Sequence, residues 1–179
     1  MVSIRYERSG DVRAREALLD AAFGEARFAK ASERLREGRL PADGLALVAA
    51  ERGQVIGTVR LWTVTAGPER PALLLGPLAV AKPARGRSIG AKLMRRALAE
   101  ARRLGHRAVL LVGDAAYYGR FGFSAEKTQG LALPGAYEPH RLLALELVAG
   151  ALDGARGMIA PAGAMQPAER AAATLRQAA

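Results

Sequence analysis

The chain has 179 residues, half of them hydrophobic, which is enough for one compact domain with a substantial core. It contains no cysteine, and this excludes disulfides, thiolate metal sites and a covalent relay through a protein thiol. The formal net charge of +10 favours anionic partners, but aromatic residues are only 5% of the chain and are scattered, so we expect no nucleic-acid surface.

In chain order, the first half predicts alternating strand patterns around an amphipathic helical region. The expected elements are a strand over residues 3–8, a helix capped by Asp11 and ending at Phe23, a second helical stretch over 26–37, and an antiparallel hairpin with strands over 45–50 and 55–65. The charges in residues 1–8 stand where a secretory signal needs an apolar run, and no later stretch is long and uncharged enough to span a bilayer. We therefore expect a soluble, cytoplasmic protein without membrane contact.

The middle of the chain predicts a strand–helix–strand crossover. A strand over 72–80 contains Gly76-Pro77, and because proline cannot donate to a ladder, the pairing there must be bulged or broken. An amphipathic helix over 88–104 and a buried strand over 108–112 follow, which makes the two strands parallel. With a short helix from Asp114 and a last strand over 142–148, the order predicts a mixed α/β sheet.

A basic, glycine-containing loop joins the strand over 72–80 to the long helix. It reads Arg85-Gly86-Arg87-Ser88-Ile89-Gly90, and Ala91 continues into the helix. Loose backbone N–H groups and the positive end of a helix together bind phosphate anions. This loop therefore predicts a site for a phosphorylated cofactor.

These residues resemble the GNAT superfamily of acyl-CoA-dependent N-acyltransferases. The family's phosphate loop has Arg or Gln, two residues, Gly, one residue, then Gly or Ala, and this chain matches at Arg85 and Gly90. It departs at Ser88, where the family usually has glycine. A second family feature, a tyrosine followed by Gly-Phe, is reproduced in the segment from Tyr118 to Phe123.

The resemblance implies a mostly antiparallel mixed sheet with a central, splayed parallel strand pair, flanked by helices. It implies an N-acetyltransferase that moves an acetyl group from acetyl-CoA directly to a primary amine of a small molecule or peptide, in a ternary complex. Pantetheine would pair with strand backbone, and the pyrophosphate would lie on loop N–H groups, with Lys82 and Lys92 among the cations that screen it. The implied cofactor-binding residues are Leu78, Ala79, Val80, Arg85, Gly86, Arg87, Ser88, Ile89, Gly90 and Ala91.

Tyr118 is the predicted general acid. A coenzyme A thiol titrates near 8.5, roughly as a cysteine does, and tyrosine near about 10, so the phenol stays protonated and can donate to the departing thiolate. Its neighbour Tyr117 should point about 100° away, so both cannot reach one sulfur. A buried tyrosine with an ordinary structural role is the alternative. No base is evident, because Asp114 also fits a helix N-cap.

Two other functions are consistent with parts of the sequence. Gly86-Arg87-Ser88-Ile89-Gly90 also fits the Gly-x-Ser-x-Gly nucleophile elbow, and Asp114 and His140 follow in the chain order of an α/β-hydrolase triad. In that fold the serine sits on a sharp turn directly at the end of a strand, whereas Lys82-Pro83-Ala84-Arg85 intervenes here after Val80, which disfavours the hydrolase. A non-catalytic sensor of CoA or acetyl-CoA is the other alternative. The separated His106 and His140 predict no metal site.

The ends of the domain and the acceptor are less constrained. We expect residues 1–149 to form a single acyl-CoA N-acyltransferase domain and residues 150–179 an Ala/Gly/Pro-rich tail, with a short helix opened by Pro167. In the family, acceptors are recognised by the regions that correspond to residues 23–40 and 127–140 here. Oligomeric state stays open, a homodimer being one option.

Overall fold

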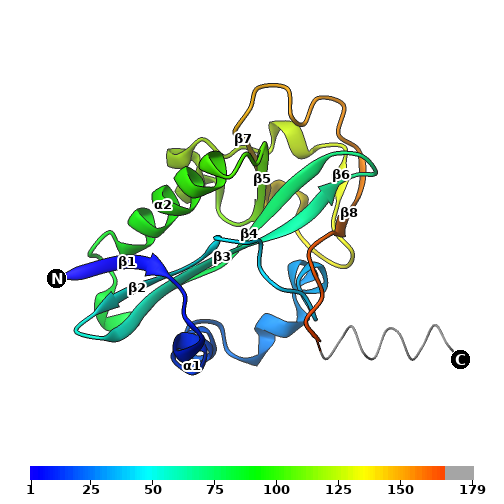
Figure 1. The fold of residues 1–179 in the computed structure, drawn as a ribbon. Coiled ribbons are helices and arrows are strands. Elements are labelled where there is room, and N and C mark those ends of the chain that lie inside the picture. Colours follow the sequence, from blue (N-terminus) through cyan, green and yellow to red (C-terminus); the bar gives the residue numbers. More distant parts are fainter. Residues whose placement is uncertain (168–179) are drawn as a thin grey trace, which may run out of the picture.

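The computed structural model describes residues 1–167 and has a mixed α/β fold around one sheet, as expected (Figure 1). The strands in path order are β1 (Val2–Tyr6), β2 (Ala46–Glu51), β3 (Gln54–Ala66), β4 (Pro71–Val80), β5 (Ala108–Val112) and β7 (Leu142–Glu146). Along this path the neighbours are antiparallel except β4 and β5, which are parallel. The predicted crossover is therefore confirmed.

The helices α1 (Val12–Phe23) and α2 (Ile89–Arg103) cover opposite faces of the sheet (Figure 1). A third, short helix is α3 (Ala115–Tyr118). Successive strand residues point to opposite faces, and on β4 Leu78 and Val80 pack in the cluster that includes α2, whereas Ala79 packs against Leu18 and Leu19 of α1. No helix within residues 1–167 has both the length and the apolar character needed to cross a membrane.

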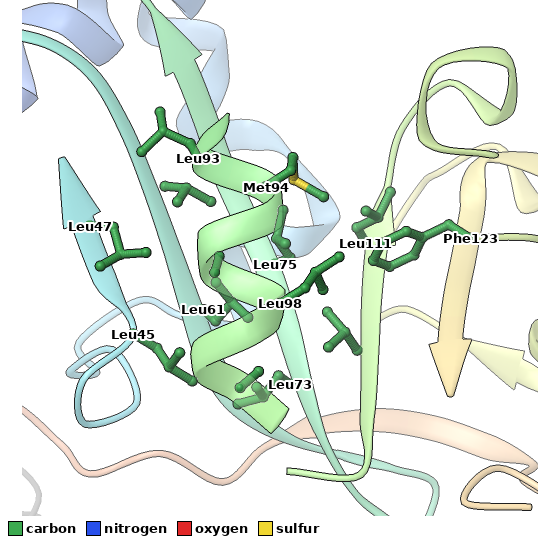
Figure 2. Packing of buried hydrophobic residues seen from close by; sticks show 14 of the residues in the cluster. Leu45, Leu47, Leu61, Leu73, Leu75, Leu93, Met94, Leu98, Leu111 and Phe123 are labelled. Carbon is green, nitrogen blue, oxygen red and sulfur yellow. The ribbon is translucent and has the colours of Figure 1, made fainter. Parts of the chain in front are cut away.

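The α2 helix packs on the sheet through one apolar face (Figure 2). Leu93, Met94 and Leu98 are buried in one cluster with the sheet residues Leu61, Leu73 and Leu111. Each fully buried leucine of this kind contributes about 2 kcal/mol. This burial anchors α2 and so fixes the position of the loop at its N-terminus.

The β4 strand changes register at the proline. Val59 pairs with Leu78 and Leu61 pairs with Leu75, so Gly76 and Pro77 together face a single residue of β3. The predicted bulge is confirmed. On the other side, β4 pairs with β5 only at Leu73 and Leu74, so the two parallel strands diverge from Leu75 onward.

The helical stretch expected over residues 26–37 is replaced by two 3-10 helices, Glu25–Ala29 and Ala31–Leu35. Lys30 between them is extended, with φ −69° and ψ 142°. The buried Arg27 is tied to α1 by ion pairs, and Ala31 and Leu35 pack in a different cluster. These separate anchors favour a break over one continuous helix.

Composition predicted a tail from residue 150, but part of this segment pairs with the sheet. Strand β8 (Gly157–Pro161) pairs antiparallel with β3 and parallel with β6 (Leu131–Ala132), and Ile159 is buried. The strand is short and bounded by glycine and proline, which hid it in the sequence. The expected terminal helix lies outside the described residues.

Asp11 precedes α1 but does not cap it with its side chain. Its carboxylate accepts hydrogen bonds from the Arg5 guanidinium at 2.6 and 2.8 Å and from the Arg8 N–H at 2.8 Å. The Arg5 hydrogen bonds lower the pKa of Asp11 from 3.8 to about 2. The charged carboxylate therefore links β1 to the start of α1.

We expect Asp11→Asn to lower the free energy of unfolding by about 1–2 kcal/mol near neutral pH. Because the folded pKa is depressed, the stabilisation is complete above 3.8 and is lost as the pH falls toward about 2. Denaturant unfolding across this range measures it, with the exposed Asp43→Asn as control. If the free energy of unfolding fell with pH in the same way in Asp11→Asn and in the wild type, the assigned role would be contradicted.

Candidate active site

The loop before α2 leaves its backbone N–H groups available. Gly86 has φ 78° and Ser88 has φ 58°, so the chain turns sharply before the helix begins at Ile89. The first N–H groups of a helix have no partner within the helix. The side chain of Ser88, which occupies the cap position, does not accept a hydrogen bond from them. The donors at Ile89, Gly90 and Ala91 therefore suit an anion.

Two arginines of this loop have protein partners. The Arg87 guanidinium donates to both carboxylate oxygens of Glu51 at 2.9 and 2.7 Å, so its side chain faces the β2–β3 hairpin. Arg85 Nε donates to the Val80 carbonyl at 3.3 Å. The expected screening of phosphate by the Arg87 side chain is not supported by this arrangement, although its backbone N–H still belongs to the loop.

A cavity of about 520 Å³ opens where β4 and β5 diverge. Its central walls are residues 75–78 of β4 and residues 112–114 at the end of β5. Because β4 and β5 pair only at Leu73 and Leu74, the edge of β4 that faces this cavity is free to pair with an extended ligand. Of the predicted strand residues, Leu78 lines the cavity and Ala79 and Val80 continue β4 beyond it, with β3 on their other side.

Tyr118 lies in the wall of this cavity. Its ring packs edge-on against Tyr117, with centroids 4.9 Å apart, and no residue in the described part of the chain forms a hydrogen bond with its hydroxyl. Burial, with a smaller effect of Tyr117, raises the pKa of Tyr118 to about 12. The phenol is therefore protonated at every physiological pH and has a donor to offer.

Two glycines accommodate the neighbouring tyrosines. A Cβ on Gly113 would lie 2.3 Å from Cε2 of Tyr118, so only glycine allows the ring to pack there. A Cβ on Gly90 would lie 3.2 Å from the Tyr117 hydroxyl. Tyr117 therefore points toward the phosphate loop and Tyr118 toward the strand gap, in agreement with the expected divergence of the two side chains.

Trp62 holds the bulge in place and was not singled out from the sequence. Its indole N–H donates to the Gly76 carbonyl at 2.6 Å, and the side chain is buried. This bond turns the Gly76 carbonyl toward the tryptophan on β3 and fixes the strand at the point of divergence. The only sequence signal was the single tryptophan of the chain, on the strand beside Gly76-Pro77.

The hydrolase alternative is not supported, because its three residues have other contacts. Ser88 occupies the cap position of α2, and the Asp114 carboxylate accepts from the Ala116 N–H at 2.9 Å as the cap of α3. His140 is largely exposed, and its Nε2 lies 3.8 Å from Glu138. Within residues 1–167 no hydrogen bond joins Ser88, Asp114 and His140. The structure therefore contains no triad at these positions.

Comparisons with known proteins agree with this geometry. The model of the acetyltransferase (GNAT) family matches residues 13–123. The chain is 33% identical over 162 residues to the uncharacterized N-acetyltransferase YhbS of Escherichia coli, covering 87% of this chain and 93% of that protein.

Two solved structures are similar over most of their length. For E. coli YhbS in complex with CoA, the TM-score is 0.76 at 32% identity, over 90% of this chain and 89% of the other. For a GNAT family acetyltransferase of Brucella melitensis in complex with acetyl-CoA, the TM-score is 0.64 at 31% identity, over 90% and 96%.

Proposed function

The chain belongs to the acetyltransferase (GNAT) family, and from this premise we propose that it transfers an acetyl group from acetyl-CoA directly to a primary amine. It is an acyltransferase, and family structures similar to it contain CoA or acetyl-CoA. The observation that carries the proposal is a cavity with a free edge of β4 and a phenol without a protein partner, whose lining residue Tyr117 reaches Gly90 at the open N-terminus of α2.

The described residues fit the donor substrate in two places. An amide-bearing pantetheine arm pairs with the free edge of β4 near Leu78 and Val80, because β5 has diverged there. The diphosphate accepts from the N–H groups between Gly86 and Ala91, where the helix end is positive. Acetyl-CoA supplies an activated acyl group as a thioester at the end of that arm.

Tyr118 donates a hydrogen bond to the departing sulfur. With a pKa of about 12 against about 8.5 for a free thiol, the phenol keeps its proton and stabilises the thiolate as a hydrogen-bond donor. In a cavity of low dielectric such a charge-assisted bond is strong. The raised pKa keeps the proton on Tyr118, so the phenol is present as a hydrogen-bond donor and is excluded as the base for the amine.

The test is steady-state kinetics of thiol release with acetyl-CoA and a panel of primary amines. We expect turnover, and double-reciprocal plots for one substrate at several fixed concentrations of the other should give intersecting lines. The reason is that the chain has no cysteine to carry the acetyl group. Parallel lines would contradict direct transfer. Tight binding of acetyl-CoA without turnover over the panel would instead support the non-catalytic sensor.

A pH profile gives a second prediction. The raised pKa of Tyr118 means that the phenol keeps its proton up to about 12, so kcat should not fall between about pH 7 and pH 10 through its ionisation. The rate should instead rise as the acceptor amine loses its proton. The measurement is kcat at saturating substrates across this range, and a descending limb near pH 10 that disappears in Tyr118→Phe would contradict it.

A further inference from the structure

The acceptor side of the cavity is lined by cationic side chains. Lys30 and Arg36 come from the segment of 3-10 helices after α1, and Arg141 comes from the turn before β7. Arg36 is buried, and a Cβ on Gly76 would lie 3.7 Å from its Nη1, so its guanidinium reaches the bulge of β4. The three cations converge from two separate segments on the point where the strands diverge.

Lys30 has no carboxylate partner among residues 1–167. Its ammonium lies 4.7 Å from the centroid of the Phe23 ring, which also lines the cavity. Burial, followed by the charges of Arg36 and Arg141, lowers the pKa of Lys30. The positive charges of Arg36 and Arg141 therefore act on Lys30, and within residues 1–167 no carboxylate pairs with its ammonium.

Of the two acidic residues in the lining, one caps a helix and the other lies beside Arg141. The Asp114 carboxylate caps α3, and Glu138 is exposed at the rim, 3.8 Å from Arg141. Arg36 keeps one carboxylate partner, Glu33 at 2.6 Å, through its Nε. Its Nη groups remain toward Gly76, where nothing within the described chain accepts from them.

We propose that the amine acceptor is a small molecule that also carries an anionic group, a carboxylate or a phosphate, bound by Lys30, Arg36 and Arg141. The proposal rests on the acetyl-transfer function proposed above and specifies its substrate class. The anion supplies acceptors for the Lys30 ammonium and the Arg36 Nη groups, which have none within residues 1–167, and adds to the long contacts of Arg141 with Gly113 at 3.5 Å and Glu138 at 3.8 Å. A cavity of about 520 Å³ that must also admit the acetyl end of the donor holds a small molecule.

The same positive charge helps the reaction at the amine. A cation bound near Lys30 and Arg36 is disfavoured, so the ammonium form of the acceptor loses its proton more readily in the cavity than in water. Only a neutral amine can attack a thioester. The cationic wall thus favours the neutral form of the amine, which is part of what a general base would otherwise do. No carboxylate in the lining is placed to act as that base.

The experiment compares amines that differ only in the anion. Free amino acids are paired with their amides, and O-phosphoethanolamine with ethanolamine, with thiol release from acetyl-CoA as readout. We expect kcat/KM at least about tenfold higher for the anionic member of one pair. The carboxylate pair and the phosphate pair distinguish the two anions. A series of ω-amino acids then gives the distance between anion and amine.

Variants identify the cations that bind the anion. Lys30→Met and Arg141→Met should each reduce the preference for the anionic member about tenfold, chiefly through KM, and Lys30→Arg should restore it. The matched control is Arg102→Met, which removes a cation from the exposed side of α2 and should keep the preference.

The outcomes separate this inference from the proposed function. Equal acetylation of anionic and neutral members by the wild type overturns the anion site and leaves acetyl transfer intact. A preference that survives in both Lys30→Met and Arg141→Met likewise overturns the assignment to these residues. No acetylation of any amine, with acetyl-CoA bound, overturns the proposed function itself.

Discussion

Tyr118→Phe is expected to lower kcat by about 10²-fold to 10³-fold while leaving KM for acetyl-CoA near the wild-type value. The variant removes only the hydroxyl, which has no hydrogen-bond partner in residues 1–167 and lies in the cavity wall. The lost hydroxyl donates to the leaving sulfur in the transition state and not to the bound substrate. We therefore expect the change in kcat. Rapid thiol-release assays at saturating substrates measure it.

The neighbouring phenol provides the comparison. Tyr117→Phe removes the hydroxyl that lies near Gly90, so we expect its effect in KM for acetyl-CoA and not in kcat. Thermal unfolding of both variants should match the wild type, because the Tyr118 hydroxyl has no internal bond to lose. A fall in kcat of less than about threefold for Tyr118→Phe would assign the residue a packing role.

Gly90→Val is expected to weaken CoA binding by about 10²-fold. In a helix the Cα–Cβ bond tilts toward the N-terminus, so the new side chain projects into the space above the free N–H groups. It would also displace Tyr117, whose hydroxyl lies 3.2 Å from the Cβ position. Calorimetric titration with CoA measures the loss.

Pantetheine, which lacks the diphosphate, separates blocked anion binding from general damage. Its affinity should change much less than that of CoA in Gly90→Val. Gly10→Val is the matched control, because a Cβ at Gly10 meets no atom within 4 Å and the residue lies far along the chain from the loop. Unchanged CoA affinity in Gly90→Val would show that the diphosphate binds elsewhere.

Local patterns predicted much of the fold. The long apolar face of α2, the hairpin of β2 and β3 and the break at Gly76-Pro77 each depend on residues close in sequence, and each was confirmed. The prediction of one helix over residues 26–37 was wrong, because the buried residues of this segment are anchored to different parts of the molecule. Strand β8 was missed because a strand of five residues that begins with glycine and ends with proline gives almost no pattern.

The cofactor loop illustrates the limit of motif reasoning at the level of side chains. The motif correctly placed residues 85–91 at the N-terminus of α2. It could not show that the guanidinium of Arg87 is bound to Glu51, since the partner comes from a hairpin tip 36 positions earlier in the chain. The roles of the loop residues toward acetyl-CoA stay predictions that the CoA titrations test.

The amino-acid order by itself determined the features that arise within one element or between adjacent ones. These are the strand–loop–helix that exposes N–H groups, the proline that interrupts a ladder, and the tyrosine next to Gly-Phe. Only the tertiary structure decided the character of the cavity. Lys30, Arg36 and Arg141 meet there because the segment after α1 and the turn before β7 pack at the divergence of β4 and β5. Burial there also raises the pKa of Tyr118, and both effects depend on distances between residues far apart in the chain.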